Sequence, residues 1–111
     1  MANLSYADFT PEEVAQRAPG TRVIDVREPH EYVGELGHID GAELVPLVTL
    51  AAEAERWERA ATLIMVCRSG ARSGRATAQL VAMGFQEVHN MVGGMLRWNA
   101  EGRATSTDFR S

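Results

Sequence analysis

The sequence predicts an α/β protein with a mostly parallel sheet. Short apolar runs alternate with helix-like segments along the 111 residues, which is the pattern of β–α units. The run Leu-Ile-Met-Val at residues 63–66 is uninterrupted and is typical of a central strand covered on both faces. A chain that is 45% hydrophobic and 23% charged has the composition of one globular domain with a single core.

Local signals predict each element of the first half in turn. Thr10-Pro11-Glu12-Glu13 combines a threonine N-cap, a proline at N1 and a glutamate at N3, so a helix should run from there to about Ala18. Residues 23–26 are rich in β-branched side chains and predict a buried strand. A short helix over residues 29–33 follows, and then a strand over residues 42–45 that Pro46 ends.

The second half continues the alternation. An apolar stripe predicts an amphipathic helix over about residues 47–60; it consists of Leu47, Leu50, Ala51, Ala54 and Trp57. After the strand at 63–66, a helix should end with Gly84 as a left-handed C-cap. A strand over residues 87–92, a Gly-Gly turn and a short helix over 95–100 complete the domain, which we place at residues 1–103. Residues 104–111 form a polar tail that we expect to fray.

Composition excludes several classes of function. A single cysteine cannot form an intrachain disulfide, a CxxC redox pair or a thiolate-rich metal site. All eleven basic residues are arginine, which excludes a Schiff-base or P-loop lysine. The net charge of −4, with acids spread along the chain, argues against a nucleic-acid partner. With no signal-like N-terminus and no long apolar run, we expect a cytoplasmic protein without membrane contact, metal or cofactor.

The single cysteine lies where ligands bind in open α/β sheets. Cys67 directly follows the apolar run at 63–66, at the carboxyl end of a predicted strand. The next six residues can curl so that their amides point inward, which makes a nest for an anion, and the following helix adds its N-terminal dipole. Gly70 supplies the backbone freedom that such a curl needs. The competing interpretation is that Cys67 is a small core side chain at a strand end.

Simple energetics show that this loop can activate the thiol. Lowering a cysteine pKa by about two units from about 8.5 requires roughly 2.7 kcal/mol of preferential stabilisation of the thiolate. A helix dipole supplies typically about 0.3–1 kcal/mol and at most about 2. Amide hydrogen bonds to a charged group, worth roughly 1.5–3 kcal/mol each, close the gap together with nearby arginines. Cys67 is therefore predicted to be a nucleophile that needs no histidine base.

Four segments, in order, resemble the single-domain rhodanese (sulfurtransferase) family: residues 23–28 (VIDVRE), 37–42 (GHIDGA), 67–73 (CRSGARS) and 93–98 (GGMLRW). The resemblance extends from about Leu4 to Gly102. It implies a rhodanese fold with a central, mostly parallel, five-stranded sheet and helices on both faces. It also implies transfer of a sulfane sulfur from a donor such as thiosulfate or a persulfide, through a Cys67 persulfide, to cyanide or a thiol.

The resemblance assigns roles to the loop residues. Cys67 is the nucleophile and sulfur carrier, and the amides that follow it stabilise the thiolate and the persulfide; they belong to Arg68, Ser69, Gly70, Ala71, Arg72 and Ser73. Arg68 and Arg72 help to hold an anionic donor. Four residues separate Cys67 from Arg72, which resembles the short loop of sulfurtransferases, whereas related phosphatases and arsenate reductases carry a longer one.

Asp25 and Arg27 flank a strand end, where we expect a structural ion pair or a brace for the loop. His38 is expected to stabilise a turn rather than to act as a base. The alternative functions are a non-catalytic sulfur relay or regulatory module with a protein partner, and, more remotely, a phosphatase or arsenate reductase.

Overall fold

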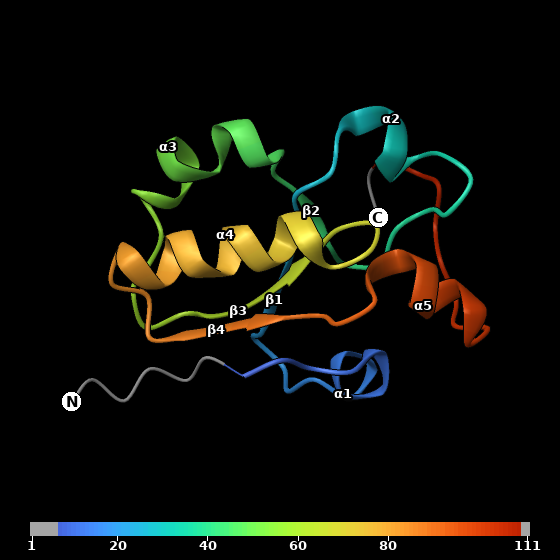
Figure 1. The fold of residues 1–111 in the computed structure, drawn as a ribbon, viewed down its shortest axis with the longest axis horizontal. Coiled ribbons are helices and arrows are strands. Elements are labelled where there is room, and N and C mark those ends of the chain that lie inside the picture. Colours follow the sequence, from blue (N-terminus) through green and yellow to red (C-terminus); the bar gives the residue numbers. More distant parts are fainter. Residues whose placement is uncertain (1–6, 110–111) are drawn as a thin grey trace.

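The computed structural model describes residues 7–109 and has a parallel sheet at its centre (Figure 1). The four strands of this sheet have the spatial order β2-β1-β3-β4, and every neighbouring pair is parallel. In chain order the elements are α1 (Pro11–Ala15), β1 (Arg22–Asp25), α2 (Pro29–Tyr32), β2 (Glu43–Leu44), a 3₁₀ turn η1 (Leu47–Thr49), α3 (Leu50–Ala54), β3 (Thr62–Val66), α4 (Ala71–Ala82), β4 (Glu87–Asn90) and α5 (Gly94–Ala100). The predicted α/β class with helices on both faces is confirmed.

Alternating side chains of the strands build a core on each face of the sheet. Ile24 and Met65 point into one cluster, where Leu50 of α3 and Leu80 of α4 cover them. Val23, Ile64 and Val66 point into the other cluster, which contains side chains of α1, α2 and α5, among them Val14, Tyr32, Met95 and Trp98. β3 is buried on both faces, and the loop that begins with Cys67 follows directly after its carboxyl end.

The sheet has one strand fewer than expected within residues 7–109. Next to β4, in place of a fifth strand, Phe9 makes a single parallel bridge to Met91, with its amide donating to the Asn90 carbonyl at 2.9 Å. Thr10 and Pro11 follow at once, and Thr10 caps α1 through the predicted capping box. The described chain therefore turns into a helix after one residue of pairing, and α1 itself is shorter than predicted.

The long amphipathic helix predicted over residues 47–60 is wrong in extent. The segment begins as a 3₁₀ turn, and α3 ends at Ala54. The Arg59 guanidinium donates to the carbonyls of Ala54 at 3.1 Å and Trp57 at 2.8 Å, and so binds the oxygens that a longer helix would use. The apolar stripe is nevertheless correct in direction, because Leu50 and Ala54 are buried and Trp57 packs on the same cluster.

Within the polar segment after residue 103, the part around Ala104 and Ser106 is held by hydrogen bonds and does not fray as expected, whereas residues 110 and 111 lie outside the described residues. The Ser106 amide donates to the His38 carbonyl at 2.9 Å, and the His38 amide donates to the Ser106 carbonyl at 2.8 Å. The Trp98 indole also donates to the Ala104 carbonyl at 3.0 Å. Backbone pairing with a buried turn is a tertiary contact that local composition does not encode.

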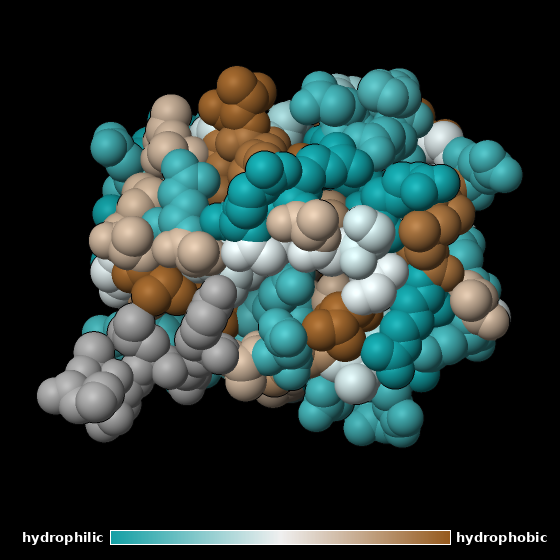
Figure 2. All heavy atoms as spheres, viewed as in Figure 1, coloured by the Kyte–Doolittle hydropathy of each residue, from teal (hydrophilic) through white to brown (hydrophobic). Residues whose placement is uncertain are grey.

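The surface shows no large apolar face in the view of Figure 2, where hydrophobic residues appear in small separate patches among polar ones. The exposed large hydrophobic side chains among residues 7–109 are Val48, Leu96 and Phe109. No helix in this part of the chain has the length and apolar character needed to cross a bilayer.

Candidate active site

The loop after β3 curls around the side chain of Cys67. Residues 67–70 connect Val66 of β3 to Ala71 of α4, and Gly70 is the N-cap of α4 with φ +105°. That left-handed conformation favours glycine, as the sequence predicts. The side chain of Cys67 is buried, whereas Arg68, Ser69 and Ala71 are exposed above it. The thiol therefore lies at the bottom of a cradle formed by its own loop.

Hydrogen-bond donors of the loop converge on the sulfur. The Gly70 amide donates to Cys67 Sγ at 3.0 Å, and the Ser73 hydroxyl lies 3.2 Å from the same atom. Burial raises the pKa of the Cys67 thiol, but hydrogen bonds from the Ser73 hydroxyl and from the amides of Ser73, Gly70 and Ser69 outweigh it, so that the net pKa is lowered. The loop thus stabilises a negative charge on sulfur without a histidine.

The N-terminus of α5 holds the other side of this loop. The Met95 amide donates to the Cys67 carbonyl at 2.9 Å, and the Leu96 amide donates to the Arg68 carbonyl at 3.0 Å. Because each peptide is planar and trans, fixing these carbonyls outward turns the next amides to the opposite side. Gly94 permits the approach: a Cβ there would lie 2.5 Å from the Cys67 and Arg68 carbonyl oxygens.

Replacement of Gly94 by alanine should damage the cradle. Gly94 has φ +57°, where a side chain costs about 1–3 kcal/mol, and the close carbonyls must also move. We expect lower stability and slower alkylation of Cys67 by iodoacetamide at neutral pH. Gly102→Ala is the matched control, because Gly102 has φ +73° with nothing within 4 Å of the added carbon. Equal alkylation rates in the two variants would contradict this role for Gly94.

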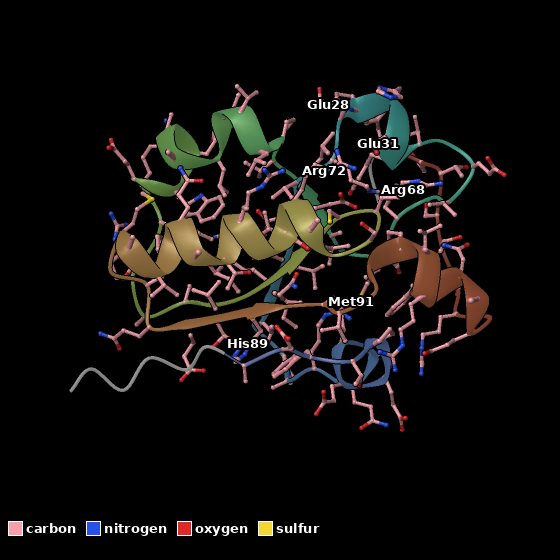
Figure 3. The ribbon with its side chains drawn as sticks, viewed as in Figure 1. Glu28, Glu31, Arg68, Arg72, His89 and Met91 are labelled. Carbon is pink, nitrogen blue, oxygen red and sulfur yellow. The ribbon has the colours of Figure 1, made fainter. Side chains whose placement is uncertain are left out.

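Arg72 is held by a carboxylate rather than free to meet a ligand. Its two terminal nitrogens donate to the two oxygens of Glu31, both at 2.8 Å, which joins α4 to α2 (Figure 3). Glu31 also accepts the Glu28 amide at 2.9 Å, at the N-terminus of α2. The expected role of Arg72 as a donor-binding residue stays a prediction, and any such role is shared with Glu31.

Stability should depend on acid pH through this pair. The Arg72 hydrogen bonds hold the pKa of Glu31 at about 2, below its ordinary value of about 4.3. A lowered carboxylate pKa stabilises the folded state above the unfolded value, and that contribution is lost as pH falls towards about 2. Urea midpoints should therefore differ between the wild type and Glu31→Gln by a constant amount at neutral pH and by progressively less below about pH 4.3.

Glu53→Gln is the matched control for this experiment, because it removes an exposed carboxylate paired with Arg56. Its effect on the urea midpoint should be small throughout. A Glu31→Gln difference that stayed constant down to about pH 2 would contradict the assigned pair.

The ion pair expected between Asp25 and Arg27 is present and buried. Arg27 donates to both Asp25 oxygens, at 2.9 and 2.7 Å, and each side chain is 1% exposed. Arg27 also donates to the Gly37 carbonyl at 2.7 Å and to the Glu31 carbonyl at 3.2 Å. The pair thus connects the end of β1 to α2 and to the turn that follows it. It is a brace beside the loop, and the positive charge of Arg27 is neutralised.

A pocket of about 320 Å³ lies next to the cysteine loop. It is lined by Arg27, His30, Glu31, Gly34, Glu35, Leu36, Arg68 and Leu96. Arg68 is exposed there and, among residues 7–109, pairs with no carboxylate. The Arg68 guanidinium is therefore available to an anion at the pocket. Arg75, in contrast, is exposed on α4.

Sequence reasoning missed Asn90 and Glu31. Asn90 ends β4, and its side chain contacts both Ser73 and Gly70. Its position at the carboxyl end of a strand was a usable signal, since ligand sites gather at that edge of a parallel sheet. For Glu31 the sequence shows only an acidic residue in the first turn of a short helix, which does not indicate a partner elsewhere in the fold. The His38 ring is tied to the end of α2: its Nδ1 lies 2.7 Å from the Tyr32 carbonyl oxygen, and the ring stacks on Tyr32 with centroids 3.6 Å apart. No group of three or more potential metal-ligand side chains occurs in residues 7–109.

The fold and the loop define a class of protein: an α/β domain in which one cysteine, following the central strand of a parallel sheet, sits in a ring of amides. A model of the rhodanese-like domain matches residues 10–101. The chain therefore belongs to the rhodanese-like family, as its four motifs indicate.

Individual relatives agree with this assignment. The chain is 35% identical over 96 residues to the uncharacterized protein YqhL of Bacillus subtilis, covering 86% of this chain and 75% of the relative. It is 30% identical over 97 residues to the thiosulfate sulfurtransferase GlpE of Pseudomonas aeruginosa, covering 86% of each. The structure of a rhodanese-related protein from Thermoplasma volcanium superposes with a TM-score of 0.83 at 25% identity, over 93% of this chain and all of that one.

Proposed function

We propose that this protein is a sulfurtransferase that carries sulfane sulfur on Cys67. One observation supports the proposal most directly: the only cysteine of the chain is held by the Gly70 amide and the Ser73 hydroxyl in a loop that lowers its pKa. The similarity to GlpE, which is a thiosulfate sulfurtransferase, supports thiosulfate as a donor. The acceptor is cyanide or a thiol.

The reaction proceeds in two displacements at sulfur. The Cys67 thiolate attacks the sulfane sulfur of thiosulfate, the S–S bond of the donor breaks, and sulfite leaves with the electron pair. The product is a persulfide on Cys67. Cyanide or a thiolate then attacks the outer sulfur, so that thiocyanate or a new persulfide leaves and the Cys67 thiolate returns. The amides that stabilise the thiolate are in position at the start and at the end of the cycle.

The donor has a place to bind beside the loop. Thiosulfate is an anion, and Arg68 is the arginine of the adjacent pocket whose charge no carboxylate in residues 7–109 neutralises. We assign Arg68 to the anionic end of the donor for this reason. Arg72 contributes its charge near the sulfur, where the Cys67 anion and the Arg72 cation attract each other.

The length of the loop favours sulfur over phosphate chemistry. The residues from 68 to 71 separate Cys67 from Arg72, and the described donors reach Sγ itself. A ring this tight suits one sulfur atom better than a tetrahedral oxyanion. The alternative is a relay in which a protein persulfide, rather than thiosulfate, supplies the sulfur to Cys67.

A direct comparison of activities tests the proposal. The wild-type protein should form thiocyanate from thiosulfate and cyanide, and it should release no phosphate from an aryl phosphate. Phosphate release that depends on Cys67, in the absence of thiocyanate formation, would overturn the proposal in favour of a phosphatase. Sulfur uptake from a protein persulfide but not from thiosulfate would replace the proposed donor by a relay partner.

A further inference from the structure

The Ser73 hydroxyl stands between two acceptors. Its oxygen lies 3.2 Å from Cys67 Sγ and 2.5 Å from Asn90 Oδ1. Ser73 is fully buried on the first turn of α4, so water does not replace either partner. A hydroxyl carries one proton and therefore makes one strong hydrogen bond as a donor at a time. The two acceptors compete for that proton.

The orientation of the Asn90 amide makes the competition unavoidable. Asn90 Nδ2 donates to the Gly70 carbonyl at 3.3 Å. A carbonyl oxygen only accepts, so the nitrogen of the amide must face Gly70 and its oxygen must face Ser73. That oxygen also only accepts. Ser73 can satisfy Asn90 only by pointing its proton away from the sulfur.

We propose that Asn90 is a positioning residue: its Oδ1 accepts the hydrogen bond of the Ser73 hydroxyl when Cys67 is neutral, and the hydroxyl donates to the sulfur instead when Cys67 is a thiolate. In the neutral thiol, and in the persulfide of the proposed function, Sγ is a weak acceptor and the hydroxyl points to Asn90. In the thiolate, Sγ is the stronger acceptor and the hydroxyl rotates towards it. No covalent bond changes in this step, and only the O–H direction differs.

The consequence is a limit on how far the loop stabilises the thiolate. The thiolate gains the Ser73 bond only as Asn90 loses it, so part of the gain is cancelled. A thiolate that is stabilised too far is a poorer nucleophile, because intrinsic nucleophilicity falls as the pKa falls. Asn90 thus keeps the sulfur reactive. It also accepts the hydrogen bond of the Ser73 hydroxyl while Cys67 carries the sulfane sulfur.

The charges around Cys67 stay constant in the variants that test this. Arg68 in the loop, Arg72 of α4, Glu31 of α2 and the Asp25–Arg27 pair at β1 are untouched by changes at Ser73 and Asn90. His89, the neighbour of Asn90 on β4, stacks on Phe9 with ring centroids 4.1 Å apart. Any change in the titration of Cys67 then reports hydrogen bonding.

The test is a double-mutant cycle on the pKa of Cys67, read from the pH dependence of its alkylation by iodoacetamide. Ser73→Ala should raise the pKa by about half to one unit, because the hydrogen bond to the charged sulfur, worth about one to two units, is partly offset by the bond to Asn90 that the hydroxyl gives up. Asn90→Leu should lower it by about half to one unit, because the hydroxyl no longer has a competing neutral acceptor. In the Ser73→Ala background, Asn90→Leu should leave the pKa unchanged.

A shift of equal size and sign in both backgrounds would show that Asn90 acts through the Gly70 carbonyl or the packing of the loop, and would overturn the proposal. A raised pKa in Asn90→Leu alone would also overturn it. Alkylation requires only a thiol, so this result does not depend on whether the protein transfers sulfur. Failure of sulfur transfer and failure of the switch are therefore separate outcomes.

A second measurement needs no change at Asn90. The side-chain amide resonances of Asn90 in the wild-type protein should shift at the pH where Cys67 ionises, because Oδ1 loses its donor there. The same resonances should not shift at that pH in Ser73→Ala. If the Asn90 amide resonances of the wild type do not shift when Cys67 ionises, the proposed switch is wrong. This holds even if the Asn90→Leu protein fails to fold.

Discussion

Replacement of Cys67 by serine should reduce thiocyanate formation from thiosulfate and cyanide to the uncatalysed rate. The chain has no second cysteine that could accept the sulfane sulfur. A serine hydroxyl has a far higher pKa than a thiol and is not ionised at neutral pH, so the displacement lacks its nucleophile. We expect the loss in kcat to be essentially complete, whatever the concentration of thiosulfate.

The structure makes this variant informative. Serine can accept from the Gly70 amide and pair with the Ser73 hydroxyl, so the loop keeps its hydrogen bonds and the protein should unfold at nearly the same denaturant concentration. Cys67→Ala would instead leave the partly buried Gly70 amide without its acceptor. Retained activity in a folded Cys67→Ser protein would show that the sulfur is not carried on this residue.

Replacement of Asp25 by alanine should have the largest effect on stability. It leaves the Arg27 guanidinium, 1% exposed, without its carboxylate, and such a loss costs about 3–5 kcal/mol. A domain of this kind is stable by only about 5–15 kcal/mol in total, so the midpoint of urea unfolding should fall steeply. Arg27 would keep its hydrogen bonds to the Gly37 and Glu31 carbonyls, but it would lose the carboxylate that neutralises its charge.

The chain contains a matched control for this prediction. Arg22 donates to both oxygens of Glu43, at 2.9 and 2.8 Å, with the same bidentate geometry, but the two side chains are 29% and 44% exposed. Glu43→Ala should therefore cost only about 0.2–1 kcal/mol. Equal losses in Asp25→Ala and Glu43→Ala would mean that burial of the Asp25–Arg27 pair does not determine its importance.

The parts of the site that lie close together in sequence could be predicted from it. The cysteine, its glycine and the first turn of α4 form one continuous strand–loop–helix segment, and the physics of that segment is local. The strands can be predicted in the same way, because runs of β-branched and apolar residues mark them directly. The Asp25–Arg27 pair spans two residues and was expected for the same reason.

The contacts that cross the fold could not be predicted in the same way. Glu31 reaches Arg72 across 41 positions, and Asn90 reaches Ser73 across 17. Both depend on how α2 and β4 are placed beside β3, which local patterns do not specify. The single-residue bridge of Phe9 to Met91 is likewise a long-range contact. The end of α3 is a different case, because the contacts of Arg59 with the Ala54 and Trp57 carbonyls are local in sequence.

Intact-protein mass spectrometry shows whether Cys67 accepts a sulfur atom. The wild-type protein and Cys67→Ser are incubated with thiosulfate and weighed before and after addition of cyanide or a thiol. Only the wild type should gain the mass of one sulfur atom, and the acceptor should remove it. Sulfur on the Cys67→Ser protein, or a wild-type adduct that neither cyanide nor a thiol removes, would show that Cys67 is not the carrier of a transferable sulfur.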